Sequence, residues 1–323
     1  MKLTPLLVLG VALAPLGAQP RTADPVKRGL QLADFPRTIK LADNVYGYED
    51  IRQPGFTTVS LFVVGQNGVL IADGQGSPPA TLRLLEAIRR VTPQPIRWYV
   101  VGSDHGDHTA GNSALPAGIT YVVHPTSRTQ LVGDSAAAAA AYARASSDSA
   151  AKGAAAPARR TIIVPPAAMD GEEHVIDLGG TQVRVAFLGR AHTGGDLMVH
   201  LPREKVLFMS EAYLNRVFPA MRSAFPSEWV RTIDRALALD VTRYVPGHGF
   251  IEAPVASREE LVTFQQALRA VIAEVTRLRT AGRTVDQAIK EASWGEYAAW
   301  FLAEQQAPVA VRKVYEELEG KLR

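Results

Sequence analysis

Residues 100–112, VVGSDHGDHTAGN, place two histidines and two aspartates within five positions. A divalent ion such as zinc binds imidazole and carboxylate donors at about 2.0 to 2.2 Å, and a catalytic ion leaves one position open for water. His105, Asp107 and His108 lie between a hydrophobic run and a small-residue turn, which can direct all three side chains to one side. The stretch therefore predicts a metal site, with Ser103 where the spacing asks for one more ligand.

Two further histidines stand in glycine-rich segments that follow apolar runs. His192 occurs in GRAHTGGD and His248 in VPGHGF. Functional side chains collect in loops at the ends of strands, so we expect the fold to bring three loops and five ligands together. The chain has no cysteine, which excludes disulfides, a lipid-anchored N-terminus and thiolate ligands.

Apolar patterning predicts the strands that carry these loops. A hairpin is expected at Asn67-Gly68, between strands at 57–64 and 68–74. Further strand signals, two of them folded at turns, occur at 95–102, 118–125, 174–189, 196–210 and 243–250. Strand hairpins interleaved with helices indicate an α/β (α+β) chain in which two sheets pack face to face with helices outside them.

Four helical regions are expected. Residues 77–91 form an amphipathic helix with apolar residues at 82, 85 and 88, and residues 225–241 form another, with Ser227 as N-cap and Trp229 on its apolar face. The alanine-rich segment from Gly133 to Arg160 predicts a helix and a mobile connection, to which we assign no chemistry. The last seventy residues are helical, with a second helix beginning near Thr284. Their apolar stripe is Phe264, Leu268, Val271, Val275 and Leu278.

The two ends of the chain carry their own signals. MKLTPLLVLGVALAPLGAQP has the layout of a secretory signal peptide cleaved after Ala18, which predicts a periplasmic or secreted protein with no stable membrane anchor after cleavage. We expect a globular domain over 36–255 and a helical extension over 256–323 that packs on it and either caps the cleft or forms a homodimer interface. The net charge is only +3 and is well mixed, so we expect a small-molecule substrate and no nucleic acid.

The joint pattern resembles the metallo-β-lactamase fold family. Its signature is His-x-His-x-Asp-His, then Gly-x-x-His-Thr-x-Gly-Asp, Leu-Phe-x-Gly-Asp and Pro-Gly-His-Gly, and the chain has SDHGDHTAGN, GRAHTGGD, VLFMSEA and VPGHG in that order. The resemblance extends from about residue 40 to about 252. It implies a four-layer αββα sandwich of two mixed sheets and a site for one or two Zn²⁺ ions.

The resemblance also implies roles for single residues. His105 and His192 would hold the first ion, and a second set would hold the other: Asp107, His108 and His248. Glu211 occupies the place of an aspartate that bridges both ions, and Asp73, in LIADG, matches an aspartate that braces the site from behind.

Two departures from the signature bear on the first ion. Ser103 replaces its first histidine, and Ser210-Glu211 replaces Gly-Asp. Serine is a poor ligand for a borderline ion at neutral pH. We expect Glu211, one methylene longer than aspartate, to reach the first ion and restore three ligands; the alternative, Asp104, would point away from the face shared by residues 103 and 105. Ser103 would then act by hydrogen bonding a bound water, and it is also a candidate for substrate binding.

The reaction class follows from the ion. A bound ion lowers the pKa of its water to about 7 and supplies hydroxide that attacks a carbonyl or phosphoryl centre. Asp107 would orient that water as the catalytic residue. The leading hypothesis is an exported zinc-dependent hydrolase whose substrate the sequence does not identify. One alternative is a class B-like β-lactamase. The other is a degenerate metal-binding or accessory protein, and Ser103 is the residue that favours it.

Other candidates are weaker. Arg216 and Arg222, in NRVFPAMRSAF, are candidates for binding an anionic substrate group, and solvated loop arginines are the alternative. His124, His174 and His200 lie in or beside expected strands and are interpreted as structural. The aromatic residues between 294 and 301 are interpreted as packing between the C-terminal helices.

Overall fold

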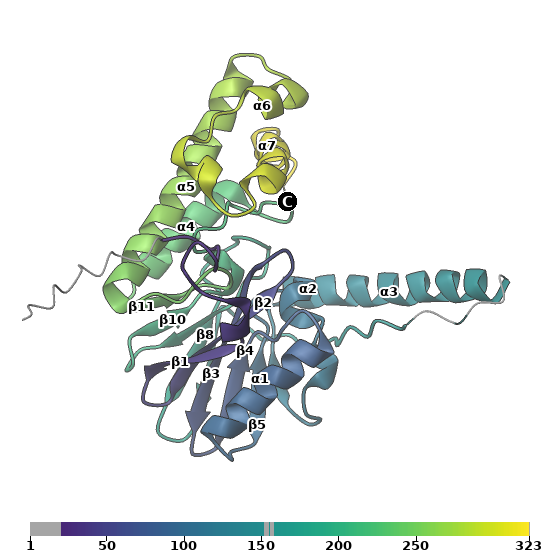
Figure 1. The fold of residues 1–323 in the computed structure, drawn as a ribbon, viewed down its shortest axis with the longest axis vertical. Helices are drawn as coiled ribbons and strands as arrows, with labels where there is room; N and C mark the ends of the chain where they lie inside the picture. The colour runs from purple at the N-terminus through teal and green to yellow at the C-terminus, as the bar shows by residue number, and fades with distance from the viewer. Residues whose placement is uncertain (1–20, 152–154, 156–157, 323) are drawn as a thin grey trace, which may run out of the picture.

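The computed structural model of the chain describes residues 21–151, 155 and 158–322. The signal peptide expected over 1–18 lies outside the described residues. Two β-sheets stack face to face, with helices on their outer faces (Figure 1). The predicted αββα sandwich is confirmed. None of the helices among the described residues combines the length and hydropathy that a membrane span needs.

The first sheet has six strands in the order of the sequence. Its first four strands run antiparallel to one another, and its last three run parallel. The expected hairpin at Asn67-Gly68 is confirmed by the pairing of Gly65 with Gly68. The strands are β1 (Arg37–Ala42), β2 (Val45–Arg52), β3 (Phe56–Gly65), β4 (Gly68–Ala72), β5 (Ile96–Val100) and β6 (Thr120–Val122).

The second sheet has five strands in the order β11-β10-β9-β8-β7. Only β10 and β11 pair in parallel, so this sheet is also mixed. The strands are β7 (Glu173–Asp177), β8 (Gln182–Ala186), β9 (Met198–Leu201), β10 (Val206–Phe208) and β11 (Arg243–Val245). The turns expected at Gly179-Gly180 and at 202–204 join β7 to β8 and β9 to β10.

Apolar side chains fill the space between the sheets, including Leu61 and Leu70 from the first and Val199 and Phe208 from the second. Helix α1 (Pro78–Val91) covers the outer face of the first sheet with Leu84, Leu85 and Ile88. Leu82, expected on the apolar face, is instead 47% exposed. It lies two residues before Leu84, about 200° around the helix from the buried stripe.

Helices α4 (Pro226–Leu237) and α5 (Pro254–Thr280) cover the second sheet, and the expected stripe of α5 is buried. Helix α7 (Ala303–Leu318) packs on α4 and α5 rather than on the strands. Helix α6 (Val285–Glu291) begins after Thr284, as predicted. The prediction of Ser227 as N-cap is wrong. Pro226 occupies the first helical position, where its missing N–H costs nothing, so Phe225 is the N-cap. Ser227 Oγ donates to Glu317 of α7 at 2.7 Å.

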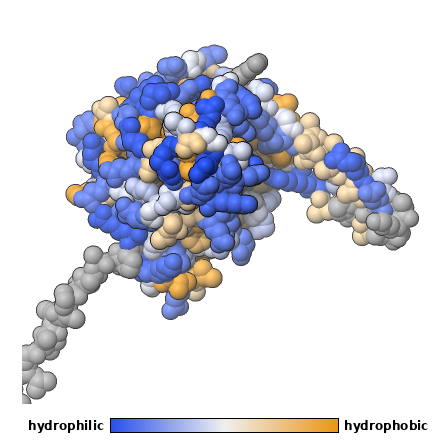
Figure 2. All heavy atoms as spheres, turned by 90° about the horizontal axis from the view of Figure 1, so that it is seen from above, coloured by the Kyte–Doolittle hydropathy of each residue, from blue (hydrophilic) through white to orange (hydrophobic). Residues whose placement is uncertain are grey.

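Two short or projecting helices border the site. Helix α2 (Gly106–Thr109) follows β5 directly, and α3 (Pro125–Ala151) begins well before the expected Gly133. Only the first turns of α3 pack on the body, where Leu131 is buried; beyond them the helix projects as an arm, which Figures 1 and 2 both show.

Candidate metal centre

Four connections at one end of the sandwich supply the predicted ligands. Residues 103–108 leave the end of β5, and His192 lies between β8 and β9. Glu211 stands in the single 3-10 turn Ser210–Ala212 after β10, and His248 follows β11. Because β10 and β11 are parallel neighbours, their ends bring the last two residues together.

The first donor group consists of His105, His192 and Glu211, whose ligand atoms lie within 4.8 Å of one another. His105 Nδ1 lies 2.9 Å from Glu211 Oε2, and His192 Nε2 lies 3.2 Å from Glu211 Oε1. The two imidazole nitrogens are 3.1 Å apart. The longer side chain of Glu211 therefore supplies the third donor where the serine cannot.

The second donor group consists of Asp107, His108, His248 and the same Glu211. His248 Nε2 lies 3.0 Å from Asp107 Oδ2 and 3.2 Å from Glu211 Oε1. His108 Nε2 lies 3.3 Å from His248 Nε2 and 3.9 Å from Glu211 Oε1. Glu211 thus stands between the two groups, with one carboxylate oxygen near both.

These separations fit a divalent ion in each group. Ligands about 2.0 to 2.1 Å from a tetrahedral ion are about 3.3 Å from one another, and most of the separations in both groups lie between 2.9 and 3.3 Å. The donors are all nitrogen and oxygen, which suits zinc and similar borderline ions. The residues therefore fit a divalent metal centre.

Ser103 is part of the support of Glu211. It is fully buried, and its Oγ donates a hydrogen bond to Glu211 Oε2 at 2.6 Å. The same Oγ accepts the backbone N–H of His105 at 3.3 Å. Ser103 thus fixes the carboxylate that replaces the missing histidine and does not line the cavity.

A hydrogen bond to His248 and an ion-pair contact to His108 orient these two imidazoles from behind. His248 Nδ1 lies 2.7 Å from the carbonyl oxygen of Thr57, so Nδ1–H donates there and leaves Nε2 free for a metal. His108 Nδ1 lies 3.0 Å from Asp73 Oδ2. The other oxygen of Asp73 accepts the backbone N–H of Gly102 at 2.7 Å, which matches a bracing role.

Ser210 stands where the family signature has a glycine, and its backbone conformation shows why glycine suits that position. Its φ of 49° lies in the left-handed region, which glycine adopts without a steric penalty and other residues rarely do. Here a serine holds that conformation, and its Oγ donates to Asp73 Oδ2. The backbone strain is thus accompanied by a contact that ties the turn carrying Glu211 to the brace of His108.

The carboxylates and imidazoles shift one another's pKa values. Burial alone would lower the pKa of His105 and His248, but the neighbouring carboxylates outweigh it and raise the pKa of each to about 9. Burial would raise the pKa of Glu211, whereas His192, His105 and His108 hold that pKa well below its usual range. The carboxylates therefore create a potential that favours cations.

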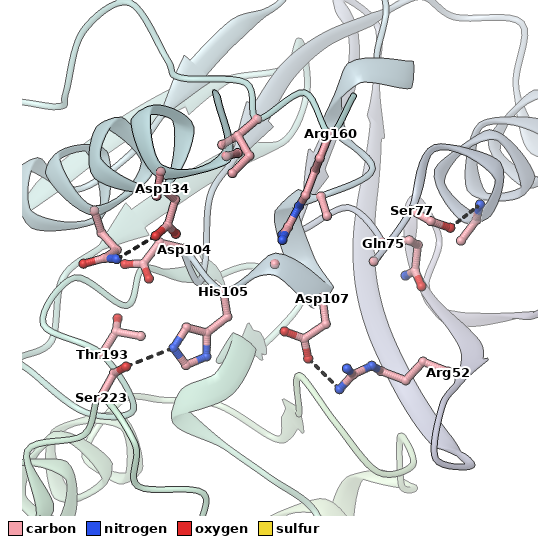
Figure 3. Close-up of a pocket in the computed structure, with 18 of the residues that line it drawn as sticks. Arg52, Gln75, Ser77, Asp104, His105, Asp107, Asp134, Arg160, Thr193 and Ser223 are labelled. Atoms are coloured by element: carbon pink, nitrogen blue, oxygen red, sulfur yellow. Dashed lines mark hydrogen bonds and ion pairs between the residues drawn. The ribbon is translucent and has the colours of Figure 1, made fainter. Parts of the chain in front are cut away.

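A cavity of about 1380 Å³ opens onto the centre. Of the donor residues, His105 and Asp107 line it, and Arg52 Nη1 lies 2.8 Å from Asp107 Oδ2 at the end of β2 (Figure 3). Sequence reasoning missed Arg52 because it gave no strand to 37–52. The alanine-rich segment, to which it assigned no chemistry, forms one wall of the cavity. Asp104 also lines the cavity and belongs to neither donor group.

Other predicted residues lie elsewhere. Arg222 lines the cavity, but Arg216 does not: its guanidinium pairs with Glu260 of α5, with Nη2 to Oε1 at 2.9 Å. None of the three histidines interpreted as structural belongs to either donor group within the described residues: His124, His174 and His200.

Asp196 also supports the site, although the sequence did not single it out. Its carboxylate accepts hydrogen bonds from the N–H and the Oγ–H of Thr193 and so fixes the loop after His192. Burial raises the pKa of Asp196 to about 7.

The comparisons with known proteins agree with this geometry. The family model of the metallo-beta-lactamase superfamily matches residues 53–248. The alpha subunit of 2,4-dinitroanisole O-demethylase from Nocardioides sp. (strain JS1661) is 25% identical over 192 residues, which are 58% of this chain and 52% of that one. The chain therefore spans about half the length of this curated relative.

Two solved structures share the fold. The inverting sec-alkylsulfatase Pisa1 from Pseudomonas sp. superposes with a TM-score of 0.66 at 16% identity, over 90% of this chain and 51% of that one. A metallo-beta-lactamase from Pontibacter korlensis superposes with a TM-score of 0.55 at 19% identity, over 72% of this chain and 99% of that one.

Proposed function

Because the chain belongs to the metallo-β-lactamase superfamily, we propose that it is an exported, zinc-dependent hydrolase. The observation that carries this proposal is the pair of donor groups that share Glu211. An ion held there supplies a hydrolytic nucleophile at neutral pH and polarises the bond to be cleaved. The substrate enters through the cavity that His105 and Asp107 line.

The residues of the chain divide the remaining work. Burial and the charge of Glu211 would raise the pKa of the Asp107 carboxyl, but its contact with His248 Nε2 and the charges of His108 and His248 outweigh both and hold that pKa low, so it stays ionised. Of the two donor carboxylates found among the described residues, Asp107 is the one that lines the cavity, which places it to accept a hydrogen bond from the attacking water. Arg52 fixes the direction of this carboxylate through its contact at 2.8 Å. Ser103 and Asp73 hold the donors from behind.

The serine at residue 103 does not by itself favour a degenerate protein. A chain that had lost its function would have no need to keep six donors within two compact groups, or to bury a serine against the carboxylate that completes the first group. The alternative of a degenerate metal-binding or accessory protein requires that the purified protein hold one metal ion or none and hydrolyse no substrate.

The test combines metal content with a substrate panel. Protein purified without chelator is analysed for zinc per chain and then assayed on a carboxylic ester, a thioester, a phosphodiester, a carbapenem and a chromogenic cephalosporin. An alkyl sulfate and an aryl methyl ether are added because the named relatives are an alkylsulfatase and an O-demethylase subunit. We expect metal to bind and one class to be hydrolysed.

Two variants make the test specific. His108→Ala removes a buried donor and is expected to lower activity by at least about 10³-fold, the scale of a lost transition-state interaction. The matched control is His174→Ala, an exposed histidine of β7 outside both donor groups, which is expected to retain activity. Metal-free protein, or equal activities of the two variants, would contradict the proposal; lactam hydrolysis alone would identify a β-lactamase.

Export is proposed on the sequence of residues 1–18. We expect the mature protein to begin after Ala18 and to be found in the periplasmic or secreted fraction. Cell fractionation followed by N-terminal sequencing tests this, and a cytosolic protein that retains Met1 would contradict it.

A further inference from the structure

The cavity at the candidate metal centre is larger than a short substrate requires. Its volume of about 1380 Å³ exceeds the roughly 300 to 1,000 Å³ of typical ligand pockets. It starts at His105 and Asp107 and continues beneath α3 as far as Ala145. From Gln130 to Ala145 the helix rises about 22 Å, so the cavity extends a long way from the centre along α3. On the other side of the centre it is lined by Gln75 and Ser77 (Figure 3).

Two guanidinium groups stand at the end next to the centre. A Cβ built on Gly106 would lie 2.7 Å from Arg160 Nη2, so this side chain lies over the loop between His105 and Asp107, as Figure 3 shows. Arg222 lines the cavity beside Ser223, whose Oγ is 3.3 Å from His105 Nε2. Both arginines therefore flank the residues that face the substrate.

The other two arginines of the described cavity lining are already engaged, and the lining also contains the carboxyl groups of Asp104 and Asp134. Arg52 pairs with Asp107 and Arg83 pairs with Asp50. Asp134 accepts a hydrogen bond from Gln130 Nε2 at 3.0 Å on α3. Among the cations of the described cavity lining, Arg160 and Arg222 are thus the ones placed to receive an anion next to the centre.

The far part of the cavity is apolar. The face of α3 that lines it changes from polar, at Gln130 and Asp134, to small and apolar along the arm. The residues of that apolar face are Ala137, Ala138, Ala141, Tyr142 and Ala145. Alanine side chains leave the space beside the helix unfilled, and the exposed Ala158 and the half-buried Ile162 of the returning segment line the other side of this open groove.

From this gradient we propose that the enzyme takes elongated amphiphilic anions. The anionic group lies next to the scissile bond and is bound by Arg160 and Arg222, and the apolar chain extends along α3. This inference rests on the proposed hydrolase function, because the centre defines the end at which the anionic group binds. A charge-assisted contact fixes the head, and burial of methylene groups provides affinity that grows with chain length.

Isothermal titration with three probes tests the ligand class without relying on activity. The probes are decanoate, butyrate and decan-1-ol, titrated below their aggregation limits into the protein purified without chelator. Decanoate is expected to bind at least tenfold more tightly than either of the others, because only it has both an anionic head and a long chain. Equal affinities for decanoate and butyrate would overturn the proposal.

Paired variants locate the site. Ala141→Trp fills the apolar part of the cavity and is expected to weaken decanoate binding at least tenfold while butyrate binding is unchanged. Ala143→Trp places the same side chain on an exposed position of α3 outside the lining and is the matched control. Arg160→Gln combined with Arg222→Gln is expected to abolish the preference for decanoate over decan-1-ol. Equal behaviour of the two tryptophan variants would overturn the proposal.

Separate readouts distinguish the two proposals. Zinc content and hydrolysis of p-nitrophenyl acetate report on the centre and do not require the apolar part of the cavity. If both are present without dependence on chain length, the ligand class is overturned and the hydrolase stands. If decanoate binds as expected to a protein without zinc or esterase activity, the hydrolase function is overturned and the ligand class stands.

Discussion

Shortening Glu211 by one methylene tests whether its length completes the first donor group. In Glu211→Asp the carboxylate withdraws by about 1.5 Å, the length of one C–C bond. In the unsubstituted chain, Glu211 Oε2 lies 2.9 Å from His105 Nδ1 and 2.6 Å from Ser103 Oγ. After the change these separations become about 4 Å, which is too long for donors that must lie about 2 Å from a shared ion.

The expected loss of zinc affinity in Glu211→Asp differs between the two donor groups. The first group keeps only His105 and His192, so its zinc affinity is expected to fall at least 10- to 100-fold, or about 1.4 to 2.8 kcal/mol. The second group keeps Asp107, His108 and His248, which are three protein ligands. Its affinity is expected to change by less than tenfold, so the stoichiometry at micromolar free zinc should fall from two ions per chain to one.

Zinc titration against a chromophoric chelator measures both affinities, and circular dichroism checks that the variant is folded. Glu211→Gln is the matched control, because it keeps the length of the side chain and removes its charge; it is expected to weaken both groups. Two zinc ions bound to Glu211→Asp with wild-type affinities would refute the reasoning, because Glu211 would then not be the ligand that replaces the missing histidine.

Four further changes have expected outcomes. Ser103→Ala removes the hydrogen bond to Glu211 and should lower zinc affinity about 10- to 100-fold; a titration like that of wild type would count against this support. Trp229→Ala empties a fully buried site and frees the carbonyl of Ala212, so urea unfolding should show a loss of about 3 to 5 kcal/mol, and a loss under 1 kcal/mol would be inconsistent with it. Ser210→Ala keeps the left-handed strain and should be about 1 to 2 kcal/mol less stable to urea than Ser210→Gly; the opposite order would disprove the strain. Chelation of zinc should lower the melting temperature in a calorimeter, since an ion at 100 times its Kd adds about 2.7 kcal/mol; an unchanged melting temperature would speak against a resident ion.

The sequence was sufficient for the parts of the site that are local. His105, Asp107 and His108 lie within four consecutive positions on a tight turn, so their spacing alone predicts a shared ion. The loops of His192 and His248 follow apolar runs whose strand character is unambiguous, and the structure brings both to the same end of the sandwich. The apolar stripe of α5 was predictable for the same reason, because its period of 3.6 is uninterrupted.

The parts that depend on distant partners were not predictable. Strand β2 contains Glu49 and Asp50, which are buried because Arg37 and Arg83 pair with them. Two buried charges hide the apolar pattern of a strand, so both β2 and Arg52 at its end were missed. Helix α3 is alanine-rich and has no stripe of large apolar side chains, which predicts a helix but gives no information about the cavity that it borders.

Anomalous diffraction at the zinc absorption edge, from crystals of the zinc-loaded protein, tests the central claim most directly. The account predicts two peaks on either side of the Glu211 carboxylate, one next to His105 and His192 and the other next to Asp107, His108 and His248. The absence of a peak from either group, or zinc bound only at other residues, would contradict it.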